Sequence, residues 1–196
     1  MSDSKTKSDE ANRFEAYFKE AYLTYHSGLV RFAQSFIKIR EDAENIVQDA
    51  FADIWETGGR AIQNRNHLLA LLFTLIKNKS IDYLRHEIVV REAETIIQEE
   101  YRRDMQMKFD TLEAFDNDLL ASGESVEDLL HKAIDALPEQ CRKIFIMNKL
   151  EGKKQSDIAT ELKISINTVE SQMSVAYRKL RKAMKNNILL LFLTSL

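Results

Sequence analysis

QSDIATELKISINTVESQMSVAYRKLRKAMK, which spans residues 155–185, decides the fold of the C-terminal half of this chain. In its first part Ile158, Ala159 and Leu162 recur at helical spacing and predict one apolar face. Ser165 follows a short interruption and is a good N-cap for a second helix. The buried stripe predicted for that helix consists of Val169, Met173, Ala176 and Leu180. Two short helices joined by a tight turn are typical of a helix-turn-helix.

The free face of the second helix carries side chains that can read DNA bases. Its candidate DNA-binding residues are Asn167, Thr168, Ser171, Gln172, Ser174, Arg178 and Lys182. Amides can pair bidentately with adenine, guanidinium groups with guanine, and hydroxyls with either base. An ordinary helix pair at a protein surface would also have a polar face. This stretch alone therefore leaves two interpretations open.

Length and composition favour an all-α protein. The 196 residues include one Pro and five Gly, and no run alternates β-branched with polar residues, as a half-buried strand would. Cys141 is the one cysteine, so an internal disulfide is excluded and a reducing compartment is natural. The opening residues 1–13 are polar, are expected to be disordered, and do not resemble a signal peptide. We therefore expect a cytoplasmic protein.

The net charge of −3 hides an uneven distribution. Residues 87–131 contain four Lys and Arg against thirteen Asp and Glu, a balance of −9. Residues 132–186 contain twelve bases against six acids, a balance of +6. The basic block includes the predicted helix-turn-helix, which is the distribution that binding to DNA phosphates requires.

The N-terminal block reads as four helices. Phe14 to Tyr25 and Leu29 to Ile37 form two apolar faces, with Gly28 expected to break the helix between them. A third helix is predicted over 41–56, with Gly58-Gly59 after its end. A polar loop then leads into a long helix from about Asn66 to His86.

Two blocks of this chain resemble the sigma-70 family, and in particular its extracytoplasmic-function (ECF) branch. EDAENIVQDAFADIWE (41–56), followed by NHLLALLFTLIKNKSIDYLRH (66–86), resembles region 2 of that family. IDALPEQCRKIFIMNKLEGKKQSDIATELKISINTVESQMSVAYRKLRK (134–182) resembles region 4. The resemblance implies two small helical domains, region 2 at 14–90 and region 4 at 125–186. An acidic, partly helical linker (91–124) would join them, and an apolar tail (187–196) would follow.

The resemblance also implies which residues contact RNA polymerase. In the family the third helix of region 2 docks on a coiled coil of the polymerase clamp. The polymerase-binding candidates are Asp42, Asn45, Gln48, Asp49 and Trp55. Asn45 stands where the family usually has an acid, and Trp55 could equally belong to the core. Part of region 4 would hold the polymerase flap.

The loop after that helix and part of the next helix correspond to the family's reader of the minus-ten element. The DNA-binding candidates there are Arg60, Gln63, Asn64, Arg65, Lys77 and Asn78. Lys77 and Asn78 match the family's basic-Asn pair, with Lys in place of the commoner Arg. The acidic linker could be a flexible solvated chain or a segment that threads the polymerase's positively charged channels.

Region 4 departs from the family at two positions. Lys163 stands in the helix-turn-helix turn where Gly is frequent, which would cost roughly 1 kcal/mol if the backbone there has positive φ. Glu170 places an acid beside the reading face, where DNA repels it unless it accepts a hydrogen bond from cytosine.

These features predict a transcription initiation factor. It would bind core RNA polymerase through clamp and flap, read the minus-ten element with region 2 and the minus-thirty-five element with region 4, and have an anti-sigma factor as regulator. A helix-turn-helix regulator with an N-terminal sensor domain would explain only the C-terminal half. An enzyme is not expected: no catalytic, metal-binding or cofactor-binding pattern and no small-molecule substrate are indicated. The nine-residue apolar end, Ile188–Leu196, is too short to insert across a membrane.

Overall fold

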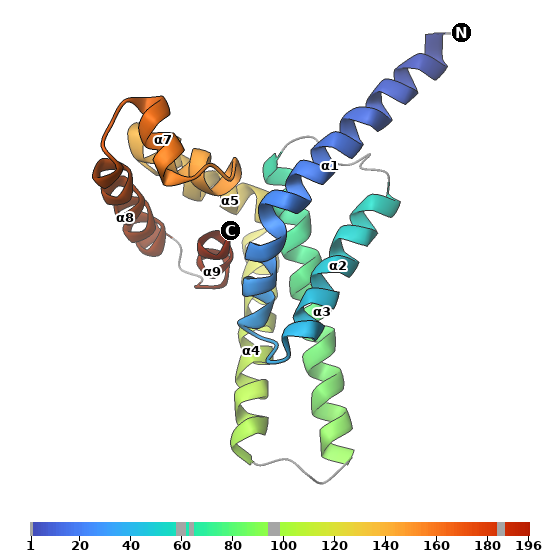
Figure 1. Cartoon of the computed structure of the whole chain (residues 1–196). Coiled ribbons are helices and arrows are strands. Elements are labelled where there is room, and N and C mark those ends of the chain that lie inside the picture. The colour runs from blue at the N-terminus through green and yellow to red at the C-terminus, as the bar shows by residue number, and fades with distance from the viewer. Residues whose placement is uncertain (1, 58–61, 63–64, 94–98, 184–186) are drawn as a thin grey trace.

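The structure, a computed structural model, describes residues 2–57, 62, 65–93, 99–183 and 187–196, and within these ranges it contains helices and turns but no strand (Figure 1). The N-terminal part comprises α1 (Ser2–Gln34), α2 (Arg40–Glu56), α3 (Arg65–Ala93) and α4 (Glu99–Ser122). The C-terminal part comprises α5 (Val126–Asp135), α6 (Glu139–Phe145), the π-helix η1 (Ile146–Leu150), α7 (Gln155–Leu162), α8 (Ile166–Ala183) and α9 (Asn187–Ser195). The all-α prediction is confirmed.

Helix α1 corrects two expectations. It is helical from Ser2, where we expected a disordered segment over 1–13, and it continues through Gly28, where we expected a break. The reason for Gly28 is close packing rather than a turn. A Cβ at this position would lie 2.5 Å from the backbone oxygen of Ser195, so only glycine allows α9 to approach so closely.

Helices α1, α2 and α3 share one apolar core, as the sequence pattern predicts. The buried face of α2 consists of Ala43, Ile46, Val47, Ala50, Phe51 and Ile54. From α3, the residues Leu68, Leu72, Phe73 and Ile76 are fully buried against it. This packing leaves the opposite face of α2 in solvent.

The acidic segment predicted as a linker is mostly one helix, which packs against α3. Figure 1 shows α4 running beside α3, and the two helices are in contact. Leu112 and Phe115 of α4 are buried, and the Phe115 ring lies 5.3 Å from that of Phe73. The flexible-chain alternative is therefore wrong for residues 99–122.

Helices α5 to α8 form the second helical unit. Its first helix begins with the predicted Ser-x-x-Asp capping box: Ser125 Oγ accepts a hydrogen bond from the Asp128 N–H, and the Asp128 carboxylate accepts one from the Ser125 N–H. Cys141 of α6 is buried under α8, and its thiol donates to the carbonyl of Gln172 at 3.3 Å. Burial raises the pKa of this thiol.

The apolar tail forms α9, which contacts both α1 and α8. Phe192 is fully buried, with ring centroids 5.3 Å from Phe32 and 5.1 Å from Phe73. Arg31 donates to the Ser195 carbonyl at 2.7 Å and Lys149 to the Thr194 carbonyl at 3.2 Å. The tail therefore packs between the two helical units.

None of the described helices is long and apolar enough to cross a membrane.

Candidate nucleic-acid interface

The helix-turn-helix is formed by α7, the turn at 163–165 and α8. Lys163 ends α7 in the left-handed conformation, with φ 54° and ψ 43°, and its N–H donates to the carbonyls of Ala159 and Thr160. Ser165 then caps α8, since its Oγ accepts from the Thr168 N–H at 3.1 Å. The predicted stripe of Val169, Met173, Ala176 and Leu180 is buried. Both the cap and the stripe agree with the prediction.

Burial of that stripe turns the opposite face of α8 to solvent. Five of the seven predicted residues on it are exposed, namely Asn167, Ser171, Ser174, Arg178 and Lys182. The other two, Thr168 and Gln172, are partly buried. The Thr168 hydroxyl is also held by Ser165 Oγ at 2.8 Å, which ties it to the cap. Glu170 is exposed beside this face.

The exposed face of α2 is acidic and amide-rich. Asn45, Gln48 and Asp49 are exposed, as expected for a docking surface. Asp42 is partly buried and accepts a 2.7 Å hydrogen bond from the Tyr83 hydroxyl. Burial is the main cause that raises the pKa of Tyr83 well above its ordinary range, and this hydrogen bond is the second. Asp42 is therefore already engaged within the fold.

Trp55 is partly packed in the core and partly exposed. It lies in an aromatic cluster, 5.6 Å from Phe14 and 5.1 Å from Phe18 between ring centroids. Yet 47% of Trp55 remains exposed. The indole is therefore held on one side by rings and open to solvent on the other.

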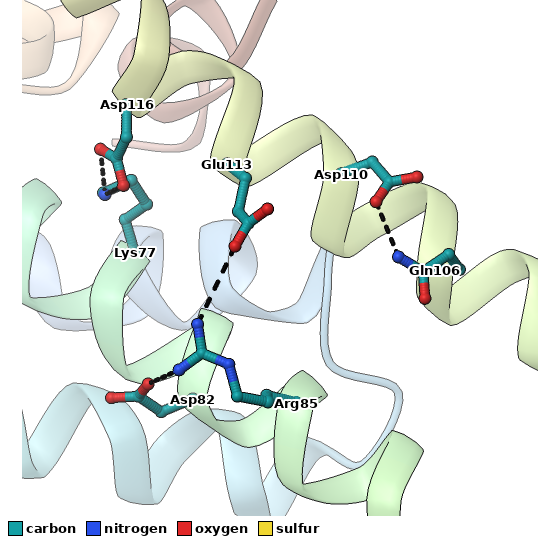
Figure 2. Close-up of polar contacts among 7 residues, drawn as sticks. All are labelled: Lys77, Asp82, Arg85, Gln106, Asp110, Glu113 and Asp116. Atoms are coloured by element: carbon teal, nitrogen blue, oxygen red, sulfur yellow. Dashed lines mark hydrogen bonds and ion pairs between the residues drawn. The ribbon is translucent and has the colours of Figure 1, made fainter. Parts of the chain in front are cut away.

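The minus-ten candidates divide into three groups. Arg60, Gln63 and Asn64 lie outside the described residues. Arg65 is the first residue of α3, but its side chain is not among those that the structure describes. Asn78 is exposed on α3. Lys77, which we expected to be available to DNA, is only 3% exposed and its ammonium group pairs with the Asp116 carboxylate (Figure 2). That expectation is wrong for the free protein, because the linker helix covers Lys77.

The sequence showed that the segment of α4 is acidic, but not that its acids would pair with bases of α3. Glu113 and Asp116 lie on the side of α4 that faces α3, and Glu113 approaches Arg85 at 3.9 Å (Figure 2). Their spacing of three residues could have marked them as one helical face. The partner on α3 could not be identified, because the pairing joins residues far apart in the chain.

No group of His, Cys, Asp and Glu side chains that could hold a metal ion occurs in the part of the chain that the structure describes.

Comparisons with known proteins agree with this arrangement. The family model described as sigma-70 region 2 matches residues 21–87, and the model described as sigma-70 region 4 matches residues 127–180. The chain is also 22% identical over 175 residues to the ECF RNA polymerase sigma factor SigX of Bacillus subtilis (strain 168), a match that covers 87% of this chain and 85% of that protein. The region 2 match spans the block that a sensor-domain regulator leaves unexplained, so that alternative is not favoured. The chain belongs to the sigma-70 family, in its ECF branch.

Proposed function

We propose that this transcription initiation factor brings core RNA polymerase to promoters through three surfaces of its own. The exposed face of α2 with Trp55 would dock on the polymerase clamp. The start of α3 and the segment before it would capture the minus-ten element, and the exposed face of α8 would read the minus-thirty-five element. It would act in the bacterial cytoplasm, where the transcription machinery works.

The observation that carries this proposal is the face of α8 that lies opposite its buried stripe. Asn167, Ser171 and Arg178 are exposed on one side of a helix whose other side is anchored in the core. Amide, hydroxyl and guanidinium groups are the donors and acceptors that the major groove distinguishes. The surrounding block is basic, which supplies attraction to the phosphates.

The first test is promoter reading by α8. Arg178→Ala should lower promoter affinity of the polymerase complex by roughly tenfold, because one guanidinium contact to a base or phosphate is lost. Arg103→Ala is the matched control, since Arg103 is an exposed base on α4 that pairs with Glu99. Footprinting and transcription initiated with core polymerase give the readout. Equal losses in both variants would show that only net charge matters.

The second test concerns Trp55. Trp55→Ala should lower the affinity for core polymerase by about tenfold, as for a partly exposed aromatic anchor. Co-elution with core polymerase over a range of concentrations gives the measurement. Leu23→Ala is the control, because Leu23 is a 73% exposed apolar residue of α1 outside the aromatic cluster. Unchanged polymerase binding in the Trp55 variant would remove α2 from the proposed interface.

Regulation by an anti-sigma factor is the remaining part of the proposal. Such a partner would cover the polymerase-facing surfaces of both regions. It would then compete with core polymerase for Trp55, so co-purification with a cellular partner should be lost in Trp55→Ala and displaced by added core polymerase.

A further inference from the structure

We propose that α4 is an internal competitor for nucleic acid, whose acidic face occupies Lys77 in the free protein and must leave α3 before region 2 captures promoter DNA. This inference rests on the proposed function, because it concerns how access to the minus-ten surface is controlled. It assigns the linker a role as a displaceable cover.

The central contact is an ion pair between α3 and α4. Both carboxylate oxygens of Asp116 accept hydrogen bonds from the Lys77 ammonium group (Figure 2). The Lys77 side chain is 3% exposed and that of Asp116 37% exposed. The lysine is thus withdrawn from solvent, while the acid that covers it remains within reach of water.

Apolar and cationic contacts hold α4 in this position. Leu112 and Phe115 are buried against region 2, with Phe115 beside Phe73. Further along α3, the Arg85 guanidinium lies 3.9 Å from Glu113 and 5.6 Å from the ring centre of Phe109. Two bases of α3 therefore pair with two acids of α4. The acids and the buried apolar residues of α4 lie on the side of that helix that faces α3.

The chemistry of this contact resembles that of a phosphate contact. A carboxylate presents two anionic oxygens to the ammonium group, as a DNA phosphate would. A buried ammonium group needs an anionic partner, because an unpaired buried charge is strongly destabilising. Lys77 can bind a phosphate only when Asp116 withdraws, so α4 and DNA compete for the same cation.

The helix also contains a natural control. Asp110 lies six residues before Asp116 on α4, but its carboxylate accepts a 2.7 Å hydrogen bond from Gln106 of the same helix (Figure 2). Asp110→Asn and Asp116→Asn remove the same charge from the same helix. Only the second removes a charge from the α3 contact.

The first experiment uses the native chain and a water-soluble carbodiimide. This reagent joins an amine and a carboxylate that are in contact into an amide, and takes up the water that is lost. The peptide that links Lys77 to Asp116 should be detected by mass spectrometry in the free protein. It should be lost when the reagent is added to the complex with core polymerase and melted promoter DNA.

The possible outcomes separate the two proposals. A crosslink that persists in a complex active in initiation, or that never forms in the free protein, would overturn the competitor role of α4. A chain that forms no complex with core polymerase would instead refute the proposed function. Because the crosslink fixes α4 over Lys77, the crosslinked free protein should bind single-stranded DNA more weakly than the untreated protein.

The second experiment compares the two variants in binding to a single-stranded DNA oligonucleotide of mixed sequence. Asp116→Asn should bind at least about fivefold more tightly than wild type, at the lower end of usual coupling between sites. Asp110→Asn should stay within about twofold of wild type. Equal gains in both variants would indicate net charge alone and contradict the proposal. Circular dichroism checks folding, and if Asp116→Asn does not fold, the crosslink in the native chain decides.

Discussion

At the scale of single residues, Lys163 carries a cost that the sequence already suggested. Gly is frequent at this position in the family, and the structure gives Lys163 the positive φ of 54° that explains why. A side chain with a Cβ is disfavoured in this left-handed conformation. The reason is local to one turn, so it could be predicted from the sequence.

Lys163→Gly should therefore raise the free energy of unfolding by about 1 kcal/mol, since glycine adopts positive φ without strain. Urea denaturation provides the measurement. Lys163→Ala is the control: it removes the same charge but keeps the Cβ, so it should show no such gain. A similar gain in both would assign the effect to charge rather than to backbone strain.

Lys77 shows the limit of reasoning at this scale. The family resemblance predicts a DNA-contacting base next to Asn78, and Asn78 is exposed. The partner of Lys77 is Asp116, which is 39 residues away in the sequence. A local pattern contains no information on which distant acid will pack against a given lysine.

At the scale of helices, the capping box of α5 was predictable because its spacing is short. Ser125 and Asp128 satisfy each other's backbone N–H groups, as the Ser-x-x-Asp pattern indicates. The hydrogen bonds from Ser125 hold the pKa of Asp128 below its ordinary value of 3.8. The cap therefore includes an ionised carboxylate that depends on Ser125.

Ser125→Ala should lower the free energy of unfolding by about 1 kcal/mol at neutral pH, through loss of the N-cap. A folded-state pKa that is depressed contributes stability above the unfolded pKa, and this contribution is lost as pH falls through the folded value. The difference between variant and wild type should thus shrink in acid. Urea denaturation at neutral and acidic pH tests this, and a difference that does not change with pH would contradict it.

The continuity of α1 was not predictable in the same way. Gly in a helical pattern usually marks an end or a weak point, which is why we expected a break at Gly28. The physical cause of Gly28 is the Ser195 carbonyl at the other end of the sequence. The buried faces of α2 and α8, by contrast, follow from their own periodicity.

At the scale of the whole molecule, α9 connects the two helical units through α1 and α8. The sequence showed that residues 188–196 are apolar but not where they pack. Only the tertiary structure shows that Phe192 lies among Phe32 and Phe73. The association of the units thus depends on surfaces from three distant parts of the chain.

Gly28→Ala should detach α9, because the added Cβ would lie 2.5 Å from the Ser195 oxygen. Alanine itself favours the helix by about 1 kcal/mol over glycine, so α1 should remain helical. We expect a larger radius of gyration by small-angle X-ray scattering and more binding of an apolar dye. Ser27→Ala, an exposed neighbour on the same helix, should change neither. An unchanged radius in Gly28→Ala would show that α9 adapts in place.

The buried thiol under α8 makes the motion of this helix measurable. Because the chain has one cysteine, a thiol-specific label can attach only at Cys141. The label must wait for α8 to lift from α6, since Cys141 is fully buried beneath it. The labelling rate therefore reports how often α8 separates from α6, and promoter DNA should slow labelling if it binds α8 as proposed.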